Sequence, residues 1–370
     1  MNILHVDTGL EWRGGQKQVL LLARAQQQRG HEVVIVCPGN GALSKRAGQA
    51  GLTTAALAHR NEFDPLAIGA LRKLVLGYDP SIIHSHTAHA LMHCSAVSLL
   101  CGRVPHIHSR RVDFPLRNRF SRLKYRLGVD RIIAISQGVQ DALTTSGIEA
   151  ERIVVVHSGI DPDRVRAEVT GTDPRRSLGI PADAFLVGTV AQLTDHKGHK
   201  YLLDAIPSIL RDHPGTRFLL AGTGELEREL RSQAERLGIS ESVLFLGFRE
   251  DISDLLSALD LFVLPSHLEG LCTSLLDAMA MGVPVVATTA GGIPEAVGEE
   301  AGLLVPPRQS AALGAAINRL LGDDGRRRAY GQAGRERVER LFRIDRTVDR
   351  TLAVYDEVLT ERAACTAEEW

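Results

Sequence analysis

The chain has 370 residues, 44% of them hydrophobic and 24% charged, which exceeds one ordinary core and predicts two globular domains. Aromatic residues make up only 4% and the formal net charge is −1, so we expect no nucleic-acid partner. The five cysteines are scattered without a CxxC pair, and together with the absence of a visible signal peptide they predict a reducing, cytoplasmic location.

Short apolar runs alternate with longer amphipathic segments through the first half of the chain. A strand is predicted at residues 2–7 (NILHVD), a helix at 16–30 and a second strand at 32–39 (EVVIVCPG). Continuous apolar strands that alternate with helices are typical of a parallel sheet covered on both faces. Further strands are predicted at residues 81–87, 104–109, 131–136 and 152–159.

The same order of elements restarts near residue 160, after a stretch rich in turn residues. We therefore predict an α/β protein with two doubly wound, Rossmann-like parallel-sheet domains that face each other across a cleft. The first domain is predicted at residues 1–165 and the second at 175–344. A last helix, at 345–362, has one apolar face and packs on one of the domains; joining the first domain is one option.

Ligands of open α/β sheets bind beyond the carboxyl ends of the strands, so the loops at those ends are the candidate sites. Gly14 and Gly15 open a helix, where they either offer backbone N–H groups to an anion or form only a tight turn. Lys197 lies just before a helix, where its ammonium group either reaches a phosphate or is simply solvated. Gly222 ends the next strand and is a weaker signal.

The stretch 259–282 breaks an apolar strand with a carboxylate and a glycine and then begins a helix. The N–H groups of a first helical turn favour a phosphate. Because a phosphate repels a carboxylate, we expect Glu269 and Asp277 to accept hydrogen bonds from sugar hydroxyls, unless they are helix caps or surface charges. The amide donors of this first turn are Gly270, Leu271, Cys272 and Thr273.

These segments, in this order, resemble the retaining, nucleotide-sugar-dependent glycosyltransferases of the GT-B fold known as glycosyl transferases group 1. The resemblance covers nearly the whole chain and is most specific at residues 269–297 (EGLCTSLLDAMAMGVPVVATTAGGIPEAV). It implies that the first domain binds the acceptor and the second binds the nucleotide sugar, with a UDP-sugar as the favoured donor. It also implies a glycan or lipid-linked acceptor, in cell-envelope polysaccharide or lipopolysaccharide synthesis.

By the same resemblance, Lys197 contacts the diphosphate of the donor. Glu269 holds the donor sugar and its phosphate together with the amides of residues 270–273, and Asp277 holds the ribose. Arg249 lies near the base, and Gly222 belongs to the same donor site. Lys197 and Glu269 are therefore expected to be catalytic.

His108, at the exit of the predicted strand at 104–109, corresponds to a position near the donor sugar and the acceptor, and it is the third expected catalytic residue. Gly14 and Gly15 approach the diphosphate. Two residues depart from the family pattern. Gln192 stands where an arginine is usual, and Asp277 stands where the pattern has a glutamate.

The reaction implied is departure of a nucleoside diphosphate while the acceptor hydroxyl attacks on the same face of the sugar. We expect no cofactor and no metal, because no Asp-x-Asp motif at a strand end suggests a metal clamp and a helix N-terminus with Lys197 can neutralise the diphosphate. Two other enzymes of the same fold stay open: a nucleotide-sugar epimerase and a synthase of a soluble glycoside. The departures at Gln192 and Asp277 also leave open a non-catalytic nucleotide- or glycan-binding protein.

Two further clusters have competing interpretations. The histidines of residues 84–93 are either packed side chains or metal ligands, and packing is favoured because no cysteine or acid completes a ligand set with His86, His89 and His93. Residues 110–127 combine apolar residues at helical spacing with many positive charges. This pattern indicates either a solvated helix or a surface for anionic lipid or acceptor, and hence a peripheral membrane location. The positive charges singled out are Arg117, Arg119, Arg122, Lys124 and Arg126.

Overall fold

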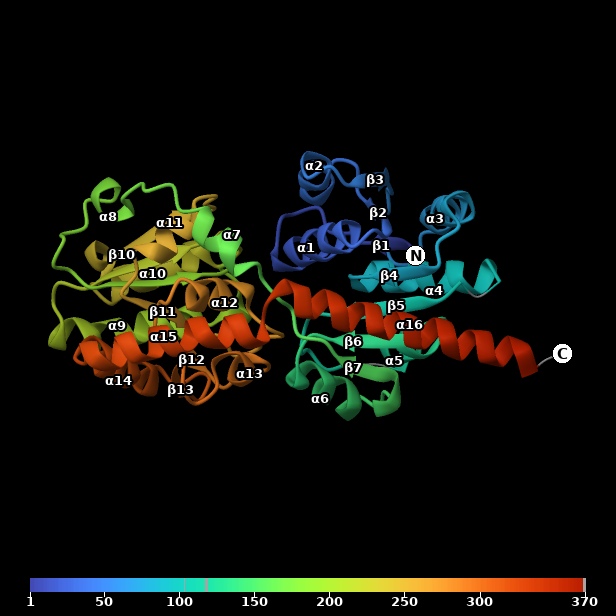
Figure 1. Cartoon of the computed structure of the whole chain (residues 1–370). Coiled ribbons are helices and arrows are strands. Elements are labelled where there is room, and N and C mark those ends of the chain that lie inside the picture. The colour runs from blue at the N-terminus through green and yellow to red at the C-terminus, as the bar shows by residue number, and fades with distance from the viewer. Residues whose placement is uncertain (103, 117–118, 369–370) are drawn as a thin grey trace. The chain divides into compact units, whose positions relative to one another are not determined.

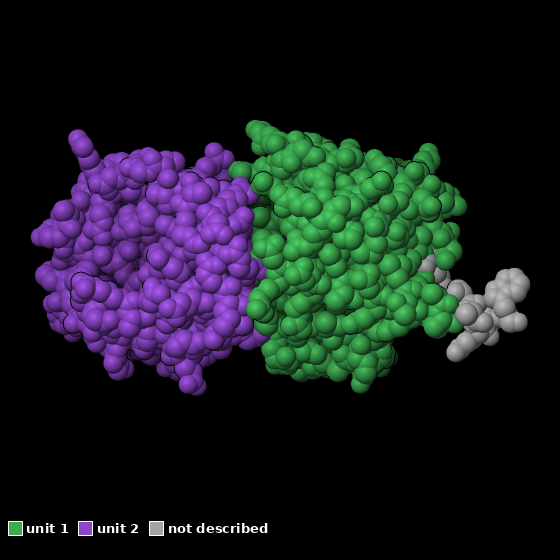
Figure 2. Space-filling model, viewed as in Figure 1, with its two compact units in different colours: residues 1–159, 344–370 green, residues 160–343 purple. Residues whose placement is uncertain are grey.

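The computed structural model describes residues 1–102, 104–116 and 119–368 and divides into two compact units (Figure 2). Unit 1 consists of Met1–Gly159 and Ile344–Trp370, and unit 2 consists of Ile160–Arg343. Each unit is built on one parallel sheet, as the continuous apolar strands predict.

The sheet of unit 1 has the strand order β3-β2-β1-β4-β5-β6-β7, with every neighbouring pair parallel. Its register places His5 opposite His84, and Ser85 opposite His108. The strand β5 ends at Arg110, so His108 lies within the strand and not at its exit. The strands are β1 (Asn2–Val6), β2 (Glu32–Cys37), β3 (Thr53–Ala56), β4 (Ile82–Ser85), β5 (His106–Arg110), β6 (Arg131–Ala134) and β7 (Ile153–Val155).

Three helices of unit 1 begin at a residue whose side chain caps the first turn. Asp64 accepts hydrogen bonds from the first-turn amides of α3, Thr87 caps α4 and Ser136 caps α6. The C-terminal helix α16 packs beside α1 and covers the core with Val354, Tyr355 and Val358 (Figure 1). The helices are α1 (Gly14–Gln28), α2 (Ala42–Gln49), α3 (Pro65–Tyr78), α4 (Ala88–Leu100), α5 (Arg119–Arg126), α6 (Gln137–Thr145), η1 (Ala150–Arg152) and α16 (Ile344–Glu368).

The sheet of unit 2 has the strand order β10-β9-β8-β11-β12-β13 and is also parallel. Its core is formed by apolar side chains of the strands together with those of α9 and α14. The strands are β8 (Leu186–Val190), β9 (Arg217–Ala221), β10 (Val243–Gly247), β11 (Leu261–Leu264), β12 (Val285–Thr288) and β13 (Gly302–Val305). The helices are α7 (Pro162–Ala167), α8 (Pro174–Ser177), η2 (Asp195–Lys197), α9 (His199–Asp212), α10 (Glu227–Arg236), η3 (Ser240–Ser242), α11 (Ile252–Ser257), α12 (Thr273–Ala280), α13 (Ile293–Val297), α14 (Ser310–Leu321) and α15 (Asp324–Leu341).

Each sheet reverses its strand order beside its first strand. In unit 1 the chain moves outward from β1 to β3 and then returns to β4 on the other side, and in unit 2 it moves from β8 to β10 and returns to β11. Crevices at the carboxyl ends of strands at such a reversal are where ligands of open α/β sheets bind. The loops after β1 and β4, and those after β8 and β11, are therefore the places to look for a site.

Candidate functional site

The strand reversal of unit 2 brings Lys197 and Glu269 together. Lys197 Nζ lies 2.5 Å from Glu269 Oε2, and the two side chains are only 14% and 9% exposed. Ser266 Oγ donates to the same carboxylate oxygen at 3.2 Å, and Thr288 Oγ1 in turn donates to the carbonyl oxygen of Ser266. Removing two charges from water is costly, so an ion pair at this edge of the sheet is better explained by a polar ligand site than by packing.

Gly198 explains how residues 72 positions apart in the sequence can meet here. Its φ is +70°, and a Cβ at this position would lie 2.1 Å from the carbonyl oxygen of Pro265. The backbone N–H of His267 donates to the carbonyl oxygen of His196 at 2.9 Å, which joins the same two loops. The loop after β8 therefore lies directly against the loop after β11, and Lys197 reaches Glu269.

Helix α12 begins at Thr273, directly after the loop that carries Glu269. Its N-cap residue, Cys272, forms no side-chain cap, which leaves first-turn amides for an anion. Ser274 Oγ donates to the carbonyl oxygen of Val190 at 2.6 Å and fixes the start of the helix to the end of β8. The structure thus places the predicted residues 269–273 at one edge with Lys197, and it buries Asp277 on the same helix.

Gly222 and Arg249 are both engaged within the chain. The N–H of Gly222 donates to the carbonyl oxygen of Gly247 at 2.8 Å, and its added Cβ would lie 2.0 Å from the carbonyl oxygen of Ala191. Gly222 thus lets the loop after β9 approach the half-buried loop that carries Gln192. The Arg249 guanidinium donates to both carboxylate oxygens of Asp251, which lowers the pKa of Asp251 and raises that of Arg249.

In unit 1, Gly14 and Gly15 form the start of α1 at the end of the loop after β1. Arg13 occupies the N-cap and forms no side-chain cap, so the first-turn amides have no ligand from that residue. A Cβ on Gly15 would lie 3.7 Å from Cδ of Arg111. The helix start and Arg111 therefore lie together at the carboxyl edge of this sheet.

His108 is almost fully buried, yet one of its ring nitrogens is available. His106 Nδ1 faces the carbonyl oxygen of Gly128 at 2.6 Å and must donate, so His106 Nε2 accepts from Ser85. Ser85 then accepts a hydrogen bond from His108 Nδ1 at 2.9 Å. The other ring nitrogen, Nε2 of His108, therefore carries a lone pair, and it forms no hydrogen bond with any described residue. Burial, followed by the charges of His106 and Arg110, holds the pKa of His108 well below its ordinary value. As a neutral acceptor, His108 Nε2 can accept a hydrogen bond from a sugar hydroxyl.

The histidines of residues 84–93 fall into separate groups. His89 and His93 lie beside the ring of His59, at centroid distances of 5.4 and 6.1 Å. His84 and His86 instead lie close to His5, and within residues 1–102, 104–116 and 119–368 this triplet is the group whose nitrogens are near enough to share a metal ion. The ring nitrogens of these three histidines are held by neighbouring side chains, as described below.

Helix α5 presents its charges to solvent. Arg119, Arg122 and Arg126 are exposed, and Lys124 forms an ion pair with Glu62. Neither Arg119 nor Arg122 forms an ion pair with any residue that the structure describes. The predicted Arg117 lies outside the described residues.

Phe120 and Leu123 of the same helix, and Leu127 directly after its end, are also uncovered. Phe120 is 41% exposed, Leu123 45% and Leu127 51%, and the ring of Phe120 contacts that of the exposed Phe63 at 5.2 Å. The periodicity of these residues predicts one apolar face, and the structure leaves that face in solvent. Across the described part of the chain, no helix is long and apolar enough to span a membrane.

Sequence reasoning missed two features of these edges. Ser266 was not singled out, although the Pro-Ser pair at the end of β11 carries the side chain that holds Glu269. Arg111 was treated as one charge in a basic segment, but its side chain is directed toward Ser158 and His86 inside unit 1. The signal was its place one residue beyond the end of β5.

Two family models match the chain, one for each unit. The model described as "Glycosyl transferases group 1" matches residues 172–337, and that described as "Glycosyltransferase Family 4" matches residues 12–164. An alpha-maltose-1-phosphate synthase from Mycolicibacterium smegmatis is 32% identical over 311 residues, which cover 75% of this chain and 79% of that protein.

Other matches are more partial. A GDP-mannose-dependent monoacylated alpha-(1-6)-phosphatidylinositol monomannoside mannosyltransferase from Corynebacterium glutamicum is 36% identical over 174 residues, or 45% of each chain. The chain thus spans about half the length of several curated relatives that it matches. The crystal structure of HepE from Anabaena in complex with UDP-glucose has a TM-score of 0.84 and 25% identity, covering 98% of this chain and all of that one. This agreement confirms the predicted fold of Rossmann-like parallel sheets.

Proposed function

The chain belongs to the glycosyl transferases group 1 family, with the GT-B fold, and we propose that it is a retaining glycosyltransferase that uses a nucleotide sugar. The proposed reaction moves a sugar from a nucleoside-diphosphate donor, with a UDP-sugar favoured, to a glycan or lipid-linked acceptor. The observation that carries this proposal is the Lys197–Glu269 pair beside the first turn of α12. The crystallised UDP-glucose complex of HepE supports the choice of base.

The proposed donor site uses the charges and amides that unit 2 brings together. Lys197 turns from Glu269 to the diphosphate, and the α12 amides bind the phosphate next to the sugar. Glu269, held by Ser266, then accepts hydrogen bonds from sugar hydroxyls. Asp277 binds the ribose and Arg249 lies near the base. Positive charge placed where the leaving group develops negative charge lowers the barrier without a metal ion.

The proposed chemical step balances without a cofactor. The acceptor oxygen forms a bond to the anomeric carbon on the face from which the diphosphate departs. The electrons of the breaking carbon–oxygen bond go to the leaving phosphate, which takes the proton of the acceptor hydroxyl on that same face. The anomeric configuration is therefore retained. The protein contributes positioning and electrostatic stabilisation.

Unit 1 is proposed to bind the acceptor. His108 supports this role because its Nε2 lone pair accepts a hydrogen bond while Nδ1 is fixed by Ser85. The exposed apolar and basic face of α5 supports a peripheral contact with an anionic membrane surface, as a lipid-linked acceptor requires. We propose cell-envelope polysaccharide or lipopolysaccharide synthesis as the setting, on the cytoplasmic side. The name of the Corynebacterium relative, which acts on a phosphatidylinositol monomannoside, supports a glycolipid acceptor.

A second candidate is a synthase that makes a soluble glycoside. The match to the maltose-1-phosphate synthase over 75% of the chain favours it. The two candidates differ in the acceptor and share the donor site, so acceptor specificity decides between them.

Product analysis tests the reaction. A screen of UDP-, GDP- and ADP-sugars against lipid-linked and soluble acceptors, read by NMR of the anomeric proton, is expected to give transfer with the configuration of the donor. An inverted product, or a donor altered with no acceptor consumed, contradicts the proposal. Activity is expected to survive excess chelator, whereas loss that manganese restores would show that a metal is required.

A further inference from the structure

A continuous chain of hydrogen bonds runs through the interior of unit 1, beneath α1 and α16. It begins at Arg111, whose Nη2 lies 3.3 Å from His86 Nδ1. His86 Nε2 then lies 2.9 Å from His5 Nδ1, and His5 Nε2 lies 2.7 Å from Gln26 Oε1. Gln26 Nε2 in turn lies 3.4 Å from the phenol oxygen of Tyr355 on α16.

The chain continues from Tyr355 back to the sheet. The phenol oxygen lies 2.5 Å from His84 Nδ1, and His84 Nε2 lies 2.7 Å from Ser109 Oγ. Ser109 and Arg111 are two residues apart in the sequence. The two ends of the chain therefore return to almost the same place, at the carboxyl end of β5.

Arg111 fixes the direction of the first bonds in this chain, because a guanidinium donates and cannot accept. His86 Nδ1 must accept from it, so His86 Nε2 carries the proton and donates to His5 Nδ1. His5 then donates through Nε2 to Gln26, and the amide nitrogen of Gln26 donates to Tyr355. Beyond this amide, we assign the phenol proton to His84 Nδ1, which the phenol oxygen faces at 2.5 Å, and His84 Nε2 then donates to Ser109.

This ordering makes His5, His84 and His86 neutral, each with its proton on Nε2. Their environment agrees, since burial is the main cause that lowers the pKa of His5 to about 4 and those of His84 and His86 well below the ordinary value. A metal ion at this triplet would break the bonds between them and would lie beside the positive charge of Arg111. The triplet is therefore better described as part of the hydrogen-bond chain than as a metal site.

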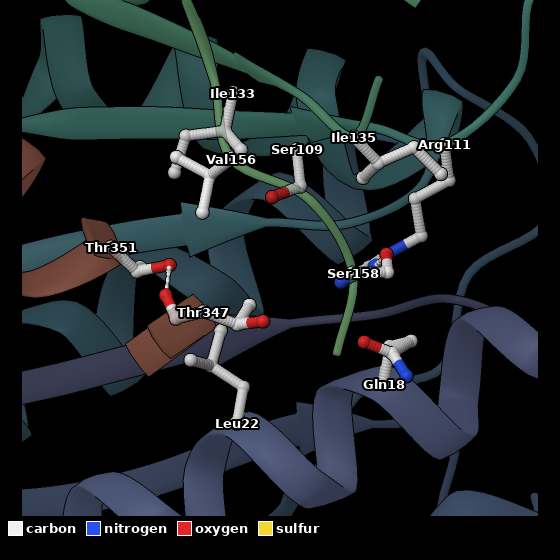
Figure 3. A pocket seen from close by; sticks show the side chains of 10 residues that line it. All are labelled: Gln18, Leu22, Ser109, Arg111, Ile133, Ile135, Val156, Ser158, Thr347 and Thr351. Atoms are coloured by element: carbon white, nitrogen blue, oxygen red, sulfur yellow. Dashed lines mark hydrogen bonds between the residues drawn. The ribbon is translucent and has the colours of Figure 1, made fainter. Parts of the chain in front are cut away.

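Both ends of the chain line one small cavity, shown in Figure 3 with Ser109, Arg111 and Ser158 at its wall. Ser109 accepts from His84, so its own proton has no described acceptor. Ser158 accepts from Arg111 Nη1 at 3.4 Å, and its proton is likewise unassigned. Arg111 Nε is buried and has no hydrogen-bond partner. The part of the wall formed by Arg111, Ser109 and Ser158 thus presents donors that lack acceptors.

The positive charge of Arg111 in the cavity wall is not paired with any carboxylate that the structure describes. Within the described part of the chain, Arg111 forms no ion pair. The nearby carboxylate of Asp7 is occupied by Gln16 Nε2 and the backbone N–H of Gly9. Burial lowers the pKa of Arg111 to about 10, and the charge of Asp7 opposes this shift, so the guanidinium stays charged at neutral pH. A buried cation with unused donors favours an anion.

We propose that this cavity is an anion subsite of unit 1 that receives one terminal oxygen of a carboxylate or phosphoryl group, bound by Arg111, Ser109 and Ser158. The enclosed space is about that of one water molecule, so only the tip of such a group enters. The hydrogen-bond chain holds the two ends of the subsite in place from opposite sides. If unit 1 binds the acceptor, as proposed above, the subsite selects an acceptor that carries a terminal anionic group.

Calorimetric titration of the full chain with inorganic phosphate, methyl phosphate and acetate tests the subsite. We expect binding that Arg111→Gln weakens by at least about tenfold and that Ser158→Ala weakens by a few-fold, since charge-assisted hydrogen bonds are the stronger ones. Ser158→Ala guards against a folding defect, because that hydroxyl is outside the histidine chain. Methyl phosphate that binds like phosphate assigns the subsite to a terminal group of a larger ligand, whereas binding of phosphate alone assigns it to a free anion.

Lys197→Ala is the matched control, because it removes a cation from unit 2 and leaves unit 1 unchanged. We expect this variant to keep the Arg111-dependent binding. An anion site lost in Lys197→Ala and kept in Arg111→Gln would place the anion in unit 2 and overturn the subsite, as would no binding of any of the three anions. If the wild type binds no nucleotide but still binds an anion at Arg111, the result contradicts the donor site and not the anion subsite. Failure of the proposed function and failure of the anion subsite are therefore distinguishable.

Nitrogen-15 NMR of the histidine rings tests the direction of the chain independently. Three buried histidines are expected as neutral Nε2–H tautomers, and Tyr355→Phe is expected to shift the His84 signals because it removes the donor to Nδ1. Nδ1–H tautomers at His5 and His86 would contradict the direction set by Arg111, and an Nδ1–H tautomer at His84 would contradict the ordering that leaves Ser109 as a donor to the cavity.

Discussion

Gly198 is the residue on which the meeting of Lys197 and Glu269 depends. Its φ of +70° belongs to the left-handed region, and the carbonyl oxygen of Pro265 fills the space that a side chain would need. We predict that Gly198→Ala destabilises unit 2 by about 1–3 kcal/mol, because both backbone strain and a steric clash oppose the native loop. Chemical denaturation measures this change.

Gly215→Ala is the control for that substitution. Gly215 lies in the loop between α9 and β9, and no atom lies within 4 Å of its added Cβ. Its substitution is expected to change stability by less than about 0.5 kcal/mol. Equal stabilities of the two variants would show that the close approach at Pro265 does not hold the Lys197 loop.

Part of the candidate site could be predicted from the sequence, residue by residue. Lys197 and Glu269 each follow an apolar strand, and parallel strands end at one edge, so their proximity could be predicted. The burial of His108 could not, because the sequence places it at the exit of a strand that the structure extends to Arg110. The Arg111 cavity also escaped prediction, since its wall combines side chains from α1, β5, β6 and α16, which are far apart in the sequence.

At the scale of elements, α5 differs from the other helices of unit 1 because its apolar side chains are not packed. Tyr125 is its only side chain classed as buried, while Phe120 and Leu123 face solvent. Periodicity predicts that a helix has an apolar face, but it does not identify what covers that face. The strands and longer helices were predictable because burial in the core selects the same periodicity that the sequence shows.

We predict that α5 binds vesicles containing anionic lipid. The double variant Arg119→Glu/Arg122→Glu is expected to weaken binding to such vesicles, read by flotation, by at least roughly 30-fold, since each basic residue near an anionic surface contributes about 1 kcal/mol. Leu123→Glu is expected to weaken binding even at high salt, where the electrostatic part is screened.

The control carries the same charge change on unit 2. Arg211 and Arg228 are exposed and, among the described residues, form no ion pair, so Arg211→Glu/Arg228→Glu alters net charge equally. This control is expected to float as the wild type does. Equal loss in both double variants would assign the effect to net charge and not to α5.

For the whole molecule, the two units differ in their buried histidines. Burial is the main cause that lowers the pKa of His5 and His106 to about 4, and it lowers those of His84, His86 and His108 well below the ordinary value. In unit 2 it lowers the pKa of His199 to about 3 and shifts that of His267 downward. Unit 1 therefore holds more histidines that must remain neutral to stay folded.

Unit 1 is expected to lose stability first on acidification. In the unfolded chain the histidines bind protons below about pH 6.5, whereas in the folded chain the buried ones do so only near pH 4. The free energy of unfolding therefore decreases as the pH is lowered from about 6.5 to about 4. Each such histidine contributes up to about 1.4 kcal/mol per pH unit. Asp7 acts in the opposite direction, since burial raises its pKa, but it is one group.

Hydrogen exchange at about pH 7 and pH 5, corrected for intrinsic rates, separates the two units. Peptides from β4 and β5 are expected to lose more protection at the lower pH than peptides from β8 and β11. Equal protection of β4 and β5 at both pH values would contradict the neutral histidine network.

The donor site is tested most directly by calorimetric binding of UDP, GDP and ADP to the wild type, Lys197→Ala and Lys200→Ala. Lys200 pairs with the exposed Asp195 and serves as the control for loss of a lysine in the same loop region. We predict that one nucleoside diphosphate binds, UDP first, and that Lys197→Ala alone weakens it by at least about tenfold. Failure of all three to bind the wild type, or equal binding by Lys197→Ala, would contradict a donor site at Lys197 and Glu269.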